Sequence, residues 1–159
     1  MPLHIGTKQV TATPMTRQAY NEYRGWTLPA DENGADEGYL VEYLDGGAPN
    51  HPKHAGYISW SPKAQFDAAY RPTTGMSFGL AIEALKAGKR VARAGWNGKG
   101  LCLELQRPDA HSKMTLPYVF MSYPSTPASE TAPANYINAR VPWLASQTDM
   151  LADDWSIVE

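Results

Sequence analysis

The chain has 159 residues, of which 43% are hydrophobic and 19% charged, so it can form one domain or two small ones with a modest core. Its formal net charge of -2 argues against binding a DNA or RNA polymer on a broad basic surface. The single cysteine, Cys102, excludes an intramolecular disulfide and favours a reducing compartment. No apolar run approaches the ~18 residues that span a bilayer, so we expect no membrane contact.

Residues 1–72 are predicted to form a small N-terminal accessory unit with its own local structure. Alternation of β-branched and polar residues over 7–13 indicates an edge strand. Thr16 is expected to cap a short helix that ends at Gly25, because a hydroxyl can accept from the first free N–H groups and glycine readily follows a helix end. A unit of this size rarely folds without support, so we expect it to dock on the second half or on a neighbouring subunit.

Two aromatic-rich runs, 38–43 and 56–60, are separated by a glycine-containing connection. Runs of this kind predict a β-hairpin. Ser61 followed by Pro62 predicts that a short helix begins here, with the proline at its first position. The aromatic ring of Phe66 is expected to pack back on the hairpin.

Residues 76–159 are predicted to form a second domain that opens with its main helix. Ser77 is expected to cap this helix and Gly88 to end it. Its apolar residues recur at the spacing that places them on one helical face: Phe78, Ile82 and Leu85.

Four strands are predicted to follow the helix, at 89–94, 101–105, 114–121 and 155–158. The first two are expected to pair as a hairpin, and the whole predicts a small antiparallel meander with one main helix, of the α+β class. The connection at 122–139 is long for a compact domain and is rich in proline, serine, threonine and alanine. A loop of this length is either a functional lid or a disordered segment.

A glycine-rich turn at 95–100 is the first candidate for a binding site. It presents Trp96, Asn97 and Lys99, and Arg93 precedes it. Phosphate groups bind to cations of this kind and to backbone N–H groups in irregular segments. The alternative is an ordinary hairpin turn with solvated charges, and the spacing matches neither a Walker loop nor a dinucleotide-binding fingerprint.

The second candidate is the stretch 143–155, which places two tryptophans around small polar side chains. Trp143 and Trp155 offer flat apolar faces, and the residues from Ser146 to Asp149 can donate and accept hydrogen bonds in several directions. Ser146 and Asp149 also have the spacing of a capping box, which predicts a short helix. This pattern suits a ligand with flat rings, and it also suits the edge of a core.

Carboxylates near the C-terminus raise the possibility of a metal centre. Asp149, Asp153 and Asp154 could bind a hard cation, although such residues more often cap helices or face water. His51 and His54 are two imidazoles without a third ligand, which is insufficient for a zinc site. No nucleophile elbow accompanies any Ser/His/Asp combination, so we expect no catalytic residues, no metal and no cofactor.

Several segments of the second domain occur in an order that resembles the bacteriophage Thoeris anti-defence protein 2 family. The resemblance covers 76–159, and the pair formed by the 95–100 turn and the 143–150 segment is its most specific part. The segments that carry it are 76–79, 84–89, 92–100, 116–118 and 143–155.

The resemblance implies a non-catalytic sponge. Proteins of that family bind the cyclic ADP-ribose isomer (gcADPR) made by bacterial TIR-domain enzymes and withhold it from its effector. They do so as homotetramers with pockets between subunits, in the cytoplasm of the infected bacterial host. Some members also bind cyclic dinucleotides at a separate site, which extends the implied activity from Thoeris to CBASS signalling.

The family motifs carry over to the following residues expected to touch ligand: Phe78, Trp96, Asn97, Trp143, Ser146, Gln147, Thr148 and Asp149. Arg93 and Lys99 are the cations expected to contact the phosphates, whereas Trp155 is assigned to the core. The first unit departs from the short members of the family, and no activity is assigned to it. Two other functions remain open: a metal-dependent enzyme that degrades a cyclic nucleotide, and a protein-interaction module without a small ligand.

Overall fold

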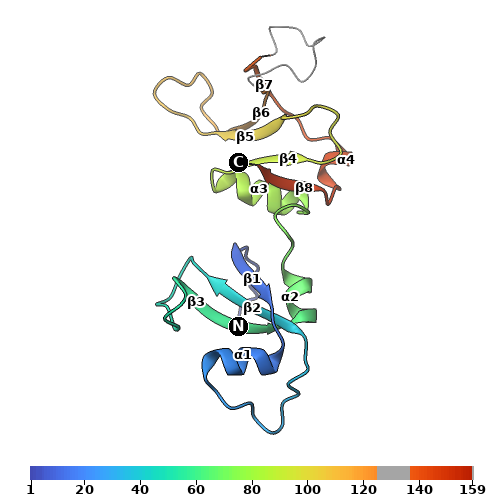
Figure 1. The fold of residues 1–159 in the computed structure, drawn as a ribbon. Helices are drawn as coiled ribbons and strands as arrows, with labels where there is room; N and C mark the ends of the chain where they lie inside the picture. The colour runs from blue at the N-terminus through green and yellow to red at the C-terminus, as the bar shows by residue number, and fades with distance from the viewer. Residues whose placement is uncertain (125–136, 159) are drawn as a thin grey trace. The chain divides into compact units, whose positions relative to one another are not determined.

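A computed structural model describes residues 1–124 and 137–158. The chain separates into two units, Met1–Tyr70 and Arg71–Glu159 (Figure 1). Each unit has its own sheet and its own buried cluster of apolar side chains. Within the described residues, no helix is both long and apolar enough to span a membrane.

The first unit contains a three-stranded antiparallel sheet. Its strands are β1 (Val10–Pro14), β2 (Gly38–Tyr43) and β3 (Tyr57–Pro62), in the order β1-β2-β3. The predicted hairpin is therefore confirmed as β2 and β3, and the predicted edge strand as β1, which begins three residues later than expected.

Two short helices accompany this sheet. Helix α1 (Arg17–Arg24) begins as predicted, because the Thr16 side chain accepts from the Ala19 N–H at 3.2 Å. Gly25 ends it in the left-handed conformation, with φ 69°. Helix α2 (Lys63–Ala69) packs the Phe66 ring 4.3 Å from that of Tyr39 on β2, as expected.

The predicted start of α2 is corrected by one residue. Ser61 stays in β3, where it pairs with Tyr39, and Pro62 occupies the cap position instead of the first helical position. The sheet ladder therefore continues through Ser61, whose backbone is engaged with β2 and cannot begin the helix.

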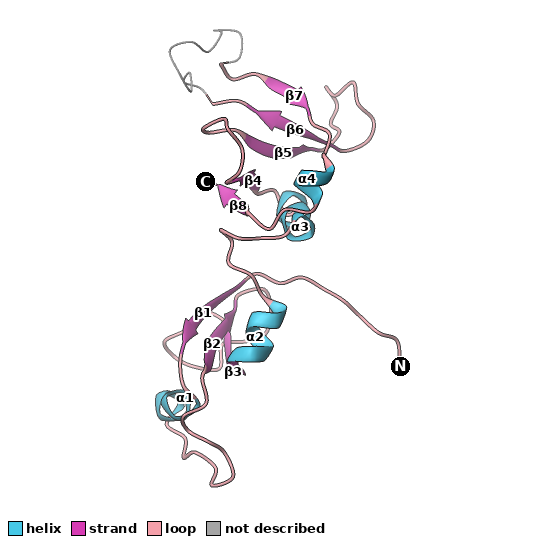
Figure 2. Cartoon of the chain, turned by 90° about the vertical axis from the view of Figure 1, so that its right-hand side faces the viewer, coloured by secondary structure: helices cyan, strands magenta, loops and turns pink. Residues whose placement is uncertain are grey.

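The second unit is built on a five-stranded antiparallel sheet in the order β7-β6-β5-β4-β8 (Figures 1 and 2). The bounds of its strands are β4 Arg90–Arg93, β5 Cys102–Gln106, β6 Tyr118–Ser122, β7 Arg140–Pro142 and β8 Trp155–Val158. The predicted α+β class and the meander are confirmed. The third strand is shorter than predicted, β7 was not predicted, and β8 closes the sheet on the far side of β4.

Helices α3 (Phe78–Lys86) and α4 (Gln147–Met150) lie on the same side of this sheet (Figure 2). The inner face of α3 buries Ala81 and Leu85 against Val91, Leu103 and Trp155. Gly88 adopts a positive φ of 80° just after the helix, as predicted. Ser77 is the N-cap, but its side chain makes no capping hydrogen bond, which corrects the expectation that its hydroxyl caps the helix.

Most of the 122–139 connection lies outside the described residues, so the expectation of a lid or disorder there stays a prediction.

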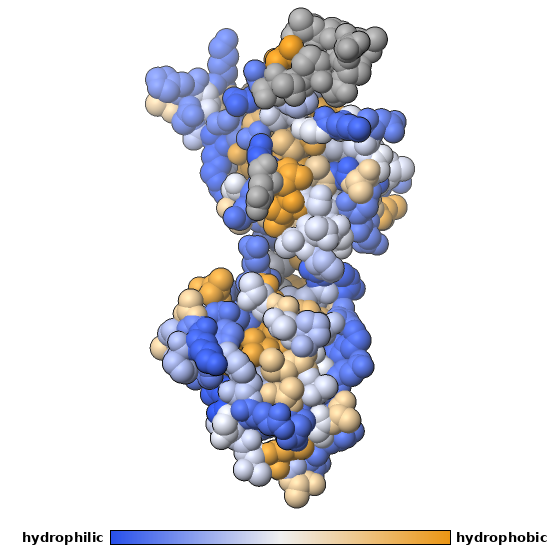
Figure 3. Space-filling view, viewed as in Figure 1, coloured by the Kyte–Doolittle hydropathy of each residue, from blue (hydrophilic) through white to orange (hydrophobic). Residues whose placement is uncertain are grey.

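Figure 3 shows that hydrophilic side chains surround smaller hydrophobic areas on the visible face of each unit. In the second unit the exposed large apolar side chains include Leu144 and Leu151 on either side of α4.

Candidate functional site

Four aromatic rings from separate segments gather in the second unit. Trp155 lies in β8, Phe78 begins α3, Trp96 lies in the 95–100 turn and Trp143 follows β7. The centroid of the Trp155 ring is 5.4 Å from those of both Phe78 and Trp96, and 6.1 Å from that of Trp143. Trp155 is fully buried, as predicted for a core residue, whereas the other three rings are half-buried. The half-buried rings can therefore offer aromatic surface to a ligand.

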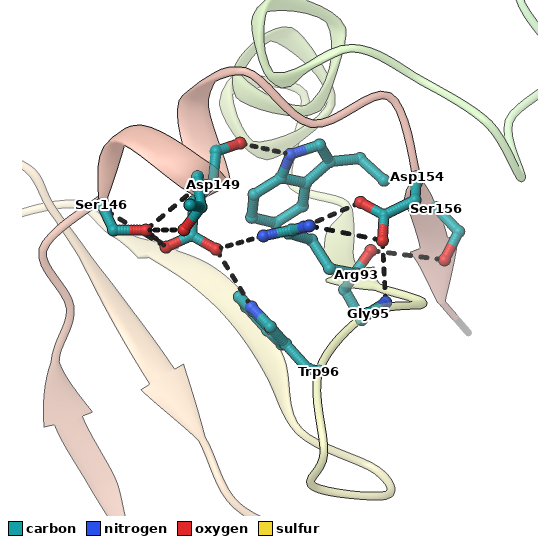
Figure 4. Close-up of polar contacts among 10 residues, drawn as sticks. Arg93, Gly95, Trp96, Ser146, Asp149, Asp154 and Ser156 are labelled. Atoms are coloured by element: carbon teal, nitrogen blue, oxygen red, sulfur yellow. Dashed lines mark hydrogen bonds and ion pairs between the residues drawn. The ribbon is translucent and has the colours of Figure 1, made fainter.

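A charged network, formed by Arg93, Asp149 and Asp154, lies beside these rings (Figure 4). Arg93 Nη1 donates to Asp149 Oδ1 at 2.8 Å, and Nε donates to Asp154 Oδ1 at 2.8 Å. We call these three residues the Arg93 network. It joins β4 both to α4 and to the residue that precedes β8.

Asp149 connects the Arg93 network to the short helix α4. Its carboxylate accepts from the backbone N–H of Ser146 at 3.1 Å, and the Ser146 hydroxyl accepts from the Asp149 N–H at 3.1 Å. This is the predicted capping box, and it satisfies free N–H groups at the start of the helix. The indole N–H of Trp96 also donates to Asp149 Oδ1 at 3.2 Å, so one buried carboxylate orients both candidate segments.

The network is ionised at neutral pH. Burial acts to raise the pKa of Asp149, but hydrogen bonds from Ser146, Arg93 and Trp96 outweigh it and lower that pKa to about 2. The hydrogen bond from Arg93 also lowers the pKa of Asp154, and the two carboxylates raise the pKa of Arg93. Two carboxylates around one guanidinium leave a net negative charge, which disfavours a phosphate at this point.

The structure brings together most of the residues predicted to form a site. The following lie in the aromatic cluster, the Arg93 network or the capping box: Phe78, Arg93, Trp96, Trp143, Ser146, Thr148 and Asp149. The side chains of Asn97, Lys99 and Gln147 are exposed and make no hydrogen bond or ion pair with another described residue. Asn97 and Lys99 nevertheless share a turn with Trp96, and Gln147 begins α4.

Sequence reasoning did not assign Asp154 to the binding site and considered it only as a metal ligand. Its carboxylate accepts from Arg93 and from the backbone N–H of Gly95, the latter at 2.7 Å. The sequence offered one signal for this role, namely that Asp154 directly precedes Trp155. In the sheet, Trp155 pairs with Arg93 at the end of β4. Sixty-one residues separate Arg93 from Asp154, so only the antiparallel pairing of β4 with β8 reveals the contact.

The Asp149 carboxylate is suited to accept hydrogen bonds and not to act as a general acid. A carboxyl with a pKa of about 2 cannot donate a proton at neutral pH, and Asp149 already accepts from several donors. Among residues 1–124 and 137–158, no three His, Cys, Asp or Glu side chains are grouped so as to hold a metal ion. What the site offers is half-buried rings, hydroxyl groups at the start of α4, and exposed amide and ammonium groups on the turn that carries Trp96.

The first unit has an open cleft of about 820 Å³, which is separate from this site. Five of its twelve lining residues are acidic, including Asp31 and Glu37, and two are basic. Arg17 lies over the Trp60 ring and pairs with Glu32. None of its lining residues lies in 76–159. The cleft therefore contains none of the residues that the sequence motifs single out.

Comparison with known proteins assigns the second unit to a protein family. The model of the Thoeris anti-defense 2-like domain family matches residues 76–158. A curated relative, Thoeris anti-defense 2 of Bacillus phage SP01, is 44% identical over 91 residues, which cover 54% of this chain and 97% of the relative. The match includes every residue of the aromatic cluster and the Arg93 network, and the predicted resemblance is confirmed. The chain belongs to the Thoeris anti-defense 2-like family.

Proposed function

We propose that this protein acts in phage anti-defence against Thoeris by binding gcADPR and withholding it from its effector. The observation that carries the proposal is the half-buried cluster of Phe78, Trp96 and Trp143 beside the capped start of α4, within the family domain. Because a phage anti-defence protein acts inside the infected cell, we propose that this protein is located in the cytoplasm of the bacterial host.

The aromatic cluster is the proposed contact for the adenine ring. Trp96 and Trp143 have ring centroids 6.3 Å apart with planes inclined at 60°, and both rings are half-buried. Stacking of a base on one such ring contributes roughly 1–3 kcal/mol. Ser146, Gln147 and Thr148 at the exposed start of α4 supply donors and acceptors for ribose hydroxyls.

The phosphates are proposed to lie near Lys99 and Asn97. The Arg93 guanidinium already faces two carboxylates, whereas Lys99 is exposed and without an ionic partner among the described residues. A diphosphate gains more from an unpaired ammonium than from a cation already neutralised by carboxylates. Arg93 keeps its place in the proposed site as the residue that holds Asp149 in position, with any phosphate contact of its own being secondary.

Sequestration requires tight binding without chemistry. Mass action then lowers the free signal and the occupancy of its effector. Of the three carboxylates that the metal-dependent alternative would use, Asp149 and Asp154 are held by Arg93, which leaves Asp153 as the exposed one. This arrangement favours the sponge over the enzyme that remained as an alternative.

We also propose a homo-oligomer, specifically a tetramer with ligand sites between subunits. Leu144 and Leu151 flank α4 with 90% and 80% of their surfaces exposed, and Met150 and Val141 are exposed nearby in the sequence. Exposed apolar side chains concentrated on one segment are typical of a protein–protein contact. Cyclic dinucleotides, and hence an effect on CBASS signalling, are proposed as additional ligands at a separate site.

The test incubates the purified protein with gcADPR, measures the heat of binding, then denatures the complex and analyses the released nucleotide by mass spectrometry. Recovery of intact gcADPR supports sequestration. Recovery of a cleaved product supports the hydrolase instead. Absence of both binding heat and a thermal shift supports a protein-interaction module, and native mass spectrometry of the same sample reports the oligomeric state.

A further inference from the structure

The start of the 95–100 turn is held in place by Asp154. Gly95 N–H donates to Asp154 Oδ2 at 2.7 Å, and Ala94 N–H donates to the Asp154 carbonyl oxygen at 3.1 Å. Two successive residues, the last before the turn and the first within it, are therefore bonded to the residue that precedes β8. This turn carries Trp96, Asn97 and Lys99, so its position fixes where three predicted ligand contacts can lie.

The same carboxylate also reaches the indole of Trp96 indirectly. Arg93 donates to Asp154 and to Asp149, and Asp149 Oδ1 accepts from Trp96 Nε1 at 3.2 Å. The backbone before Trp96 is thus held by Asp154, and the Trp96 indole is held directly by Asp149. The Arg93 guanidinium links the two carboxylates. Figure 4 shows these contacts converging between β4, the turn and α4.

Asp154 itself is poorly suited to contact a ligand with phosphate groups. Oδ1 accepts from Arg93 Nε at 2.8 Å, and Oδ2 accepts from Gly95 N–H and, at 3.5 Å, from Arg93 Nη2. Both oxygens are already in use, and their negative charge repels phosphate. What Asp154 can do is fix the geometry of the groups around it.

We propose that Asp154 is a positioning residue: it holds the 95–100 turn against α4 so that Trp96 stands at a fixed distance from Trp143. The consequence for affinity depends on the nucleotide-binding function proposed above. The positioning itself is a property of the protein without ligand, and it can be measured in the free protein.

The first experiment compares amide hydrogen exchange in full-length Asp154→Asn and Asp153→Asn by NMR. Asp153 is the matched control, because its side chain is exposed and makes no hydrogen bond or ion pair with another described residue. We expect exchange at Gly95 and Trp96 to rise about tenfold or more in Asp154→Asn, with Val91 and Leu103 unchanged. A uniform rise across the sheet, or no change in the turn, overturns the proposal.

Gly95→Ala perturbs the same contact from the opposite side while keeping the carboxylate. A Cβ at this position would stand 3.0 Å from Asp154 Oδ2 and 3.3 Å from Arg93 Nη2, closer than these atoms tolerate without shifting. We expect the same local rise in exchange as in Asp154→Asn. If Asp154→Asn does not fold, this variant decides the question: unchanged exchange at Trp96 contradicts positioning by Asp154.

The second experiment measures gcADPR affinity in the same variants. Asp154→Asn should bind at least about tenfold more weakly than wild type, because a binding group displaced by about 1 Å loses its contacts. Combined with Trp96→Ala, the loss should fall short of the product of the two single losses, since Asp154 acts through the turn. Independent, multiplicative losses contradict the proposal. If wild type binds no gcADPR, the proposed function fails, and the exchange data still decide the role of Asp154.

Discussion

At the scale of single residues, the site depends on tryptophans that differ in burial. Trp155 is fully buried and donates its indole N–H to the Asp149 carbonyl oxygen at 3.0 Å. Trp143 lies on the same cluster but is half-buried. The first ring is therefore structural, and the second has surface left for a ligand.

Trp143→Ala is expected to abolish measurable nucleotide binding while leaving the oligomer intact. Loss of one stacking partner costs roughly 1–3 kcal/mol, and the truncation also removes the ring against which Phe78 and Trp96 pack. Calorimetry with gcADPR and native mass spectrometry check the two halves of this prediction. Trp26→Ala, which alters an exposed ring in the first unit, serves as the control and should bind normally. An unfolded Trp143→Ala would instead identify Trp143 as a core residue.

Asp149 is expected to make stability fall in acid. Because its pKa of about 2 lies below the ordinary 3.8, its ionised form stabilises the fold above about pH 4, and this contribution is lost as the pH falls toward 2. The contribution is on the order of 2 kcal/mol. Urea unfolding between pH 7 and pH 2 should show the Asp149→Asn variant losing less stability than wild type. Parallel pH curves for the two proteins would contradict the assignment.

At the scale of elements, the single turn of α4 is too short to be stable by itself. Its start is held by the reciprocal hydrogen bonds between Ser146 and Asp149, and the Arg93 network fixes it to β4. The segment that offers polar groups to a ligand is thus kept in a helical conformation by side-chain contacts. The hydrophobic contribution of α4 is small, since Met150 and Leu151 are exposed.

Ser146→Ala is expected to lower the free energy of unfolding by about 1 kcal/mol, the usual cost of removing an N-cap hydroxyl. The loss follows because the Asp149 N–H then has no side-chain acceptor. Thermal and urea unfolding measure the change, with Thr115→Ala in an exposed loop as the matched control. An effect no larger than that of the control would mean that the capping box does not stabilise α4 in solution.

At the scale of the whole molecule, the family match and the proposed site both lie in the second unit. The relative from Bacillus phage SP01 matches over 97% of its own length, so a domain of this size occurs without the first unit. The first unit has its own sheet, core and acidic cleft. These observations support assigning the proposed nucleotide binding to the second unit.

A chain shortened to residues 71–159 is therefore expected to fold and to bind gcADPR within about threefold of the full-length affinity, since residues without shared partners contribute independently. Circular dichroism checks the fold and calorimetry checks the affinity. If the shortened chain folds but no longer binds, the first unit contributes to the site. The proposal for the second unit alone would then be wrong.

The local elements followed from the sequence because their signals are short-range. The Thr16 and Gly25 boundaries of α1, the aromatic strands 38–43 and 56–60, and the capping box at Ser146 depend on neighbours a few residues apart. Strand β7 was not predicted because the three residues that end at Pro142 are too few to carry a periodic signal. The strand forms through its pairing with β6, which is visible only in the sheet. The family resemblance likewise rested on residues readable in order along the chain.

The sequence by itself also determined which residue types gather in the second unit: tryptophans, small polar side chains and cations. Only the tertiary structure decided how Arg93 is used, because its two carboxylate partners come from segments 56 and 61 residues away. An ion pair depends on distance in space, and only the pairing of β4 with β8 brings Asp154 to Arg93. For that reason Arg93, a cation expected to contact the phosphates, lies between two carboxylates. The burial of Trp155 results from its packing against the residues of α3.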